Sequence, residues 1–283
     1  MNLFTDLEFN TRFLDALNRI SESTFEAVVR HEHRETVGPR VSGLGSCARK
    51  QYYNASGTME TDPRDPTGAW ASTLGNFGQS LAAMVLREMG YEVKDEELEV
   101  TLEDGLIVGH IDGLMSGLDL GDAIAVWDSK FKSIWGMVGT KNSYGIAVDG
   151  LPWSDPAIYL QLQTYLLATE ATVAIVTAHP FDFSALRTQA AIKKIDASPV
   201  YRLVLETDEE AQQLALHRGK MVAVAVSMGE AGLPMREFDP ARDNFPCNYC
   251  EWKSKCVADG GGFKLMFPPI PERMRIKPVE VSA

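Results

Sequence analysis

The segment Ala123-Ile124-Ala125-Val126-Trp127-Asp128-Ser129-Lys130-Phe131 carries the central signal of this chain. Its apolar first half predicts a buried β-strand over residues 123–131. Because side chains alternate along a strand, Asp128 and Lys130 point to one face and Ser129 to the other. A carboxylate and an ammonium at the end of an apolar strand are costly to bury without a use or a satisfied network. Alone, the tripeptide also fits a surface ion pair.

A second carboxylate, Asp112, follows the apolar end of the preceding predicted strand. The link between the two strands is short, so antiparallel pairing would bring Asp112 beside Asp128. Two neighbouring carboxylates bind a hard cation such as Mg²⁺ or Mn²⁺. Such a cation can activate water, and Lys130 can orient the nucleophile or stabilise developing charge. Without the Asp128 pair, Asp112 would be interpreted as a turn residue. His110 shares its face, where a structural histidine is as good an interpretation as a site residue.

A third element of the pattern is Gln161-Leu162-Gln163-Thr164-Tyr165, within a helix predicted over 157–169. Gln161 and Tyr165 are four residues apart and therefore share a helix face. An amide and a phenol so placed could hold a loop, a phosphate or Lys130. Taken alone, they would equally fit an ordinary amphipathic helix.

The remaining segments indicate an α/β chain in which a mixed sheet is flanked by helices. A strand pair over 91–100 and 106–115 predicts a hairpin, and residues 132–155 predict a long loop over a site. Helices are predicted over 1–38, 74–89 and 209–228, and further strands over 172–178, 190–195 and 203–205.

Bulk composition bounds the function classes. The chain has 283 residues, 45% of them hydrophobic, which predicts a packed core, and a net charge of -12. That charge counts against a nucleic-acid partner, because phosphate contacts need Lys and Arg. It does not exclude one, since acidic ligands for divalent ions and a local basic groove are compatible with an acidic chain. No apolar stretch is long enough to span a bilayer, and the first residues lack signal-peptide features. A cytoplasmic protein of a bacterial or phage-infected cell, without membrane association, is expected.

Four cysteines are distributed unevenly. Cys247, Cys250 and Cys256 crowd together near the C-terminus, and Cys47 stands alone upstream. In a reducing compartment such a set indicates metal binding more than disulfides or four unrelated buried thiols. Four thiolates suit either Zn²⁺ or an iron–sulfur cluster, and the spacing does not decide between them.

The order Asp112, Asp128-x-Lys130, Gln161-x-x-x-Tyr165 within an α/β pattern resembles the RecB-like nucleases of the PD-(D/E)XK superfamily. The resemblance implies a restriction-endonuclease-like core that hydrolyses phosphodiester bonds in DNA as an exonuclease. It implies that Asp112 and Asp128 bind the divalent ion and that Lys130 is catalytic. It also places Gln161 and Tyr165 on a helix beside the site.

This family carries a further helix motif of the form G-x-x-x-H or G-x-x-x-E. Gly75-Asn76-Phe77-Gly78-Gln79 occupies the corresponding place but ends in Gln79. An amide is a poor metal ligand compared with His or Glu, so this departure leaves the third protein ligand open. Gln79 and the backbone carbonyl of Ser129 are the remaining candidates.

The setting Ser46-Cys47-Ala48-Arg49, together with the C-terminal cysteine triplet, is similar to the iron–sulfur subgroup of this family. That subgroup includes CRISPR-associated RecB-like exonucleases, the AddB nuclease domain and related phage exonucleases. The resemblance implies a [4Fe–4S] cluster held by Cys47, Cys247, Cys250 and Cys256. It implies one nuclease domain over 1–283, with an N-terminal helical region 1–56, a catalytic core 70–230 and a cluster-binding segment and tail 234–283.

The expected partner is DNA, as single strands or ends, with a helicase or recombination protein as a further partner. Aromatic side chains can stack on bases and basic ones can contact phosphates. The candidate contacts are Arg49, Lys50, Lys132, Lys141, Lys253, Lys255, Trp135, Tyr144 and Trp153. The alternative function is a non-catalytic module that binds DNA ends or a partner and retains the nuclease fold.

Overall fold

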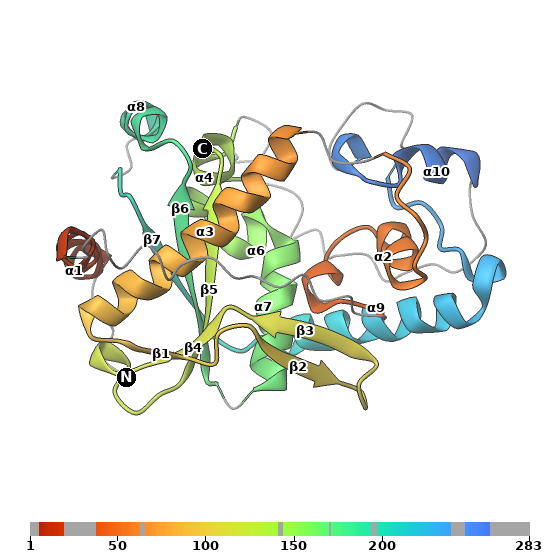
Figure 1. Ribbon diagram of the computed structural model, residues 1–283, viewed down its shortest axis with the longest axis horizontal. Coiled ribbons are helices and arrows are strands. Elements are labelled where there is room, and N and C mark those ends of the chain that lie inside the picture. The colour runs from red at the N-terminus through yellow and green to blue at the C-terminus, as the bar shows by residue number, and fades with distance from the viewer. Residues whose placement is uncertain are drawn as a thin grey trace, which may run out of the picture.

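A computed structural model describes residues 6–19, 38–62, 66–140, 144–169, 171–193, 197–238 and 247–260. Its centre is a five-stranded mixed sheet with the order β1-β4-β5-β6-β7 (Figure 1). Only β5 and β6 are parallel, and the other neighbours are antiparallel. The bounds are Glu92–Lys94 for β1, Gly113–Ser116 for β4, Ala125–Lys132 for β5, Val173–Pro180 for β6 and Tyr201–Leu205 for β7. The predicted α/β class with a mixed sheet flanked by helices is confirmed.

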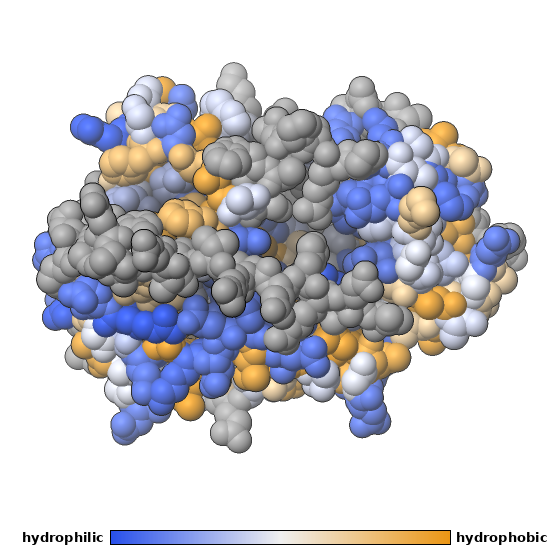
Figure 2. All heavy atoms as spheres, viewed as in Figure 1, coloured by the Kyte–Doolittle hydropathy of each residue, from blue (hydrophilic) through white to orange (hydrophobic). Residues whose placement is uncertain are grey.

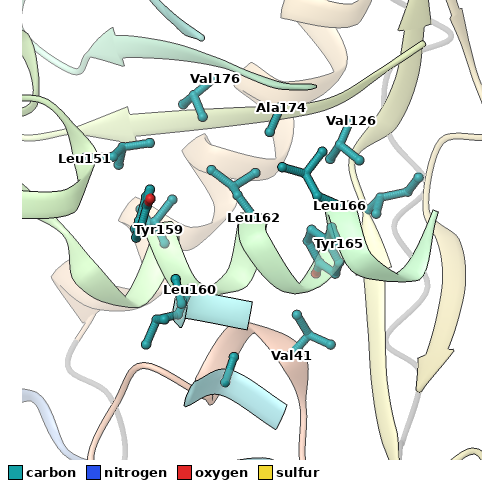
Figure 3. Close-up of a cluster of buried hydrophobic side chains, with 14 of the residues drawn as sticks. Val41, Val126, Leu151, Tyr159, Leu160, Leu162, Tyr165, Leu166, Ala174 and Val176 are labelled. Carbon is teal, nitrogen blue, oxygen red and sulfur yellow. The ribbon is translucent and has the colours of Figure 1, made fainter. Parts of the chain in front are cut away.

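Helices cover both faces of this sheet. On one face, α1 (Asp6–Arg19) and α3 (Pro66–Met89) bury Ala125 and Trp127 of β5. On the other face, α7 (Pro156–Ala168) packs on Val126, as the labelled side chains of Figure 3 show. α9 (Glu209–Ser227) packs in turn on α7. Alternate residues of β5 therefore serve two cores, which explains why this strand is apolar throughout its first half. It also sends Asp128 and Lys130 towards the α7 face.

A separate two-stranded sheet extends the β3–β4 segment outward. β2 (Leu98–Leu102) pairs with β3 (Ile107–Ile111) in an antiparallel hairpin beneath α9 in the view of Figure 1. β3 and β4 are separated by Asp112 alone, so the chain leaves the main sheet at this residue. The predicted hairpin is confirmed, and the predicted strand 91–100 is divided by a turn at 95–97.

The N-terminal and C-terminal parts of the chain meet at the end of the molecule that carries α2 (Ala48–Ala55), η5 (Cys247–Tyr249) and α10 (Lys253–Ala258). Buried Arg49 donates to the carbonyl of Pro234 from Nε and Nη2, at 2.9 and 2.7 Å, and from Nη1 to the carbonyl of Gly260 at 2.7 Å. Tyr53 donates to Asp259 at 2.8 Å and Trp252 to the carbonyl of Thr58 at 2.9 Å. These contacts tie the two segments together.

Three sequence predictions differ from the structure. Residues 132–155 do not form a plain loop, because Ser133 caps α4 and Pro152 lies in the first turn of α6. The strand predicted over 190–195 is wrong: residues up to Lys193 belong to helix α8, whose start is capped by Asp182. The helix predicted to begin at residue 74 begins at Pro66, a residue suited to a first helical turn.

The remaining helices are short, and none in the described part of the chain is long and apolar enough to cross a membrane. Their bounds are Ile134–Val138 for α4, Ile146–Asp149 for α5, Leu151–Ser154 for α6, Phe183–Lys193 for α8, Val41–Gly43 for η2, Leu118–Leu120 for η3 and Gly229–Gly232 for η4.

Candidate active site

The strand register brings the two aspartates together. Gly113 of β4 pairs with Trp127 of β5, so the next position outward places Asp112 opposite Asp128. The backbone N–H of Ser129 donates to Oδ2 of Asp112 at 2.8 Å. The break between β3 and β4 releases Asp112 from the ladder while this bond holds its carboxylate against β5. Antiparallel pairing therefore produces the juxtaposition that the sequence predicted.

Asp128 and Lys130 form a close pair at the end of β5. The Lys130 ammonium nitrogen lies 2.8 Å from each carboxylate oxygen of Asp128, whose side chain is fully buried. Burial works against the charged form of Lys130, but the Asp128 and Asp112 carboxylates outweigh it and raise the pKa of the ammonium. Oδ2 of Asp128 is buried and contacts the Lys130 ammonium as an ion pair without hydrogen-bond geometry.

Asp112 differs from an ordinary carboxyl group. Burial, and then the negative charge of Asp128, raises its pKa to about 7 from 3.8. The charge of Lys130 and the hydrogen bond from the Ser129 amide lower the pKa of Asp112, but they do not cancel the increase. Two carboxylates that resist ionising together are typical of a site that holds a positive charge between them.

The raised pKa of Asp112 makes a prediction about stability. Below the unfolded-state pKa, Asp112 is protonated in both states. As the pH rises from 3.8 to about 7, the unfolded chain loses this proton before the folded one does, so the free energy of unfolding falls. In Asp112→Asn this decline should be reduced. Near neutral pH and without divalent ions, the free energy of unfolding of the variant should exceed that of the wild type by about 1–3 kcal/mol. Near pH 4 the two free energies should be equal. Urea unfolding in chelator at several pH values measures this difference. A variant less stable than the wild type at neutral pH would contradict the prediction.

Tyr165 connects α7 to the strand that ends at Asp112. Its hydroxyl donates to the carbonyl of His110 at 2.6 Å and accepts from Gln161 Nε2 at 3.2 Å. Burial, and then the charge of Asp128, raises the pKa of Tyr165, so the phenol remains a donor. Gly109 permits this approach, because a Cβ there would lie 2.8 Å from the Tyr165 ring. Gln161 and Tyr165 therefore position the Asp112 strand.

His110 itself faces away from this arrangement. Its Nε2 lies 3.5 Å from Glu99, its partner across the β2–β3 hairpin. The structural interpretation of this histidine fits better than a role in the site.

Gln79 and one acidic residue that sequence reasoning missed lie at the rim of the site. Gln79 Nε2 donates to Oε1 of Glu97 at 2.9 Å. Glu97 lies in the turn between β1 and β2, and its negative charge contributes to the raised pKa of Asp112. The acidic run Asp95-Glu96-Glu97 between two strands was the available signal. Nothing in the spacing relates it to Asp112, because the hairpin fold determines that proximity.

The donor set suits a hard divalent cation. Mg²⁺ is commonly held by one or two protein carboxylates, with solvent and substrate phosphate as its other ligands. Asp112 and Asp128 provide these two carboxylates, which the register of β4 and β5 places opposite each other. Across the described ranges no three Asp, Glu, His or Cys side chains are grouped closely enough to hold an ion by themselves.

The cysteines are placed on elements that the fold brings together. Cys47 precedes α2, Cys256 lies in α10, and both are partly buried without disulfides, as are Cys247 and Cys250. Burial raises the pKa of the Cys47 thiol, to which the Cys256 charge adds. Arg49 Nη1 lies 3.5 Å from the Cys256 sulfur. Four soft sulfur donors suit Zn²⁺ or an iron–sulfur cluster. In the structure as described, however, no three of these thiols lie close enough together to hold an ion.

Two of the predicted DNA contacts are wrong. Arg49 is 1% exposed and is used in backbone contacts, and Tyr144 is buried against Trp153 with ring centroids 5.6 Å apart. Trp135, in contrast, is 53% exposed and remains a candidate.

The lysine candidates divide differently. Lys50, Lys132 and Lys255 form ion pairs with Glu251, Asp155 and Asp259. Hydrogen bonds from Ser254 lower the pKa of the Asp62 carboxyl, and the charge of the nearby Lys253 adds to this effect. Lys141 lies outside the described residues.

Comparisons with known proteins give weak likenesses. No protein-family model and no curated protein matches the sequence. The alkaline exonuclease LHK-Exo from Laribacter hongkongensis matches with 14% identity and a TM-score of 0.44, over 74% of this chain and 93% of that one. The structure of LHK-Exo in complex with dAMP matches with 14% identity and a TM-score of 0.46, over 68% of this chain and 88% of that one. SSO0001 matches with 16% identity and a TM-score of 0.44, over 89% of this chain and 97% of that one. At such values the likeness says nothing about the chemistry of the site, which must come from the chain's own side chains.

Proposed function

We propose that this protein is a divalent-metal-dependent DNA nuclease of the RecB-like PD-(D/E)XK type. The observation that carries the proposal is the meeting of Asp112, Asp128 and Lys130 at the end of β5. A buried ion pair with a second carboxylate beside it costs folding free energy, and a phosphodiester hydrolase has a use for this arrangement.

Each side chain has a role in this proposal. Asp112 and Asp128 hold Mg²⁺ or Mn²⁺, which when bound supplies a Lewis acid for the phosphate and lowers the pKa of the attacking water. Lys130 remains protonated, so it stabilises negative charge that develops on the phosphate rather than accepting a proton. Tyr165 and Gln161 keep the Asp112 strand in register. The exposed Trp135 offers a stacking surface for a base of a single strand or a frayed end.

The direct test is cleavage of end-labelled single- and double-stranded DNA by the purified protein with Mg²⁺, with Mn²⁺ and with chelator. Lys130→Ala should lower the rate about 100-fold while Mn²⁺ still binds, because the two carboxylates remain. Mononucleotide products would indicate an exonuclease, and internal fragments an endonuclease. DNA binding without turnover in any metal would favour the non-catalytic module, and equal rates for wild type and Lys130→Ala would overturn the proposed mechanism.

We propose in addition that Cys47, Cys247, Cys250 and Cys256 hold a structural [4Fe–4S] cluster. The contacts that join α2 to Cys256 and Asp259, and four cysteines that form no disulfide, support this proposal. Metal and sulfide analysis of protein purified without oxygen tests it, together with visible absorbance. Zinc in place of iron would overturn the cluster while leaving the nuclease proposal standing.

A further inference from the structure

The side chain of Gln79 is engaged by a carboxylate. Its Nε2 donates to Oε1 of Glu97 at 2.9 Å. An amide that donates to a carboxylate holds that anion in place. An amide is itself a weak ligand of a divalent cation. The partner of Gln79, however, is the negatively charged carboxylate of Glu97, which attracts such a cation.

The position of Gln79 is fixed by close packing of α3 on β5. A Cβ at Gly78 would lie 2.2 Å from ring atoms of Phe131, the residue that follows Lys130. Only glycine lets the helix come this near to the strand that carries the catalytic pair. The next helix residue, Gln79, is consequently held near the end of β5.

Glu97 is presented by an irregular turn. Asp95 and Glu97 both adopt positive φ, 51° and 57°, which L residues rarely adopt. Figure 2 shows hydrophilic residues over β1 and the neighbouring part of this face. The side chain of Glu97 is only partly exposed, whereas Asp95 and Glu96 in the same turn are exposed. Glu97 is therefore the member of the run that the turn directs inward.

We propose that Gln79 is a positioning residue that holds Glu97 as a third carboxylate at the rim of the cation site. The inference rests on the proposed function, because it concerns the same site. In this arrangement Gln79 is not a ligand: the acid missing from the helix is supplied by the β1–β2 turn. The hydrogen bond from Gln79 to Glu97 and the close packing of Gly78 on Phe131 carry this assignment. The ligand class is a hard divalent ion, and Glu97 acts by its charge from the rim.

The experiment measures Mn²⁺ affinity by calorimetry on the full chain, apart from any cleavage. Glu97→Gln should weaken binding about tenfold, because one negative charge near a divalent ion is lost. Gln79→Ala should weaken binding by a similar or smaller factor. In the double variant Gln79→Ala should have no further effect, because the residue it positions is already neutral. Glu96→Gln, whose partner is Arg87, is the matched control and should bind as the wild type does.

Three outcomes would overturn the inference. If Glu97→Gln left the Mn²⁺ affinity unchanged, Glu97 would not be a third carboxylate of the cation site. An undiminished effect of Gln79→Ala in the Glu97→Gln background would make Gln79 a ligand in its own right. If Glu96→Gln weakened Mn²⁺ binding as much as Glu97→Gln does, the effect would be due to the general negative charge of the surface. Absence of both Mn²⁺ binding and cleavage in the wild type would instead count against the proposed function itself.

Discussion

Asp128→Asn is expected to lower metal-dependent DNA cleavage by about 100- to 1,000-fold and to abolish measurable Mn²⁺ binding. Asp128 is fully buried, and both of its carboxylate oxygens lie 2.8 Å from the Lys130 ammonium nitrogen. The amide has nearly the same shape but no charge for the cation. Calorimetry with Mn²⁺ and cleavage of labelled DNA measure the two losses.

The control for this change is Asp95→Asn, in the exposed turn between β1 and β2. Asn tolerates the positive φ at this position, so the fold should be preserved. This variant should cleave DNA at the wild-type rate. Full activity in Asp128→Asn, with the circular dichroism spectrum of the wild type, would refute the assignment of Asp128 as a metal ligand.

Arg49→Met is expected to destabilise the protein by about 3–5 kcal/mol. The side chain is 1% exposed and donates to the carbonyls of Pro234, Gly260 and, at 3.4 Å, Cys256. Met fills similar space but leaves these buried acceptors without a donor. The segment that carries α10 should detach first, because Arg49 is its main buried link to α2. Urea unfolding measures the loss, and hydrogen exchange over 247–260 locates it.

The matched control is Lys220→Met, which removes a lysine whose ion pair with Glu103 is half-exposed. Exposed pairs contribute about 0–1 kcal/mol, so this change should be nearly neutral. If Arg49→Met is equally neutral, or if exchange over 247–260 does not rise before global unfolding, then Arg49 is not the link between the two chain segments. The cysteines or their bound group would then hold the segment.

Several features could be predicted from local sequence. The apolar run before Asp128 predicts a buried strand, because two cores need alternate residues of it. The alternation of side chains then sets Lys130 beside Asp128, and the helical repeat sets Gln161 beside Tyr165. These contacts connect residues close in sequence, so the backbone period determines them.

Other predictions failed where local patterns were ambiguous. The segment over 190–195 has apolar residues suited to a strand, but its described residues, up to Lys193, continue a helix capped at Asp182. Arg49 and Tyr144 have side chains suited to DNA, yet packing buries both. Burial of a basic or aromatic residue depends on distant elements, which composition does not show.

The sequence by itself determined the chemistry available: two aspartates, one lysine, four thiols and the α/β order of the elements that carry them. Only the tertiary structure decided which of these groups meet. The strand register places Asp112 against Ser129, the β1–β2 turn brings Glu97 to Gln79, and Arg49 is enclosed by the C-terminal segment. The physical reason is that such contacts join residues far apart in the chain, and the packing of whole elements, rather than local periodicity, sets their distances.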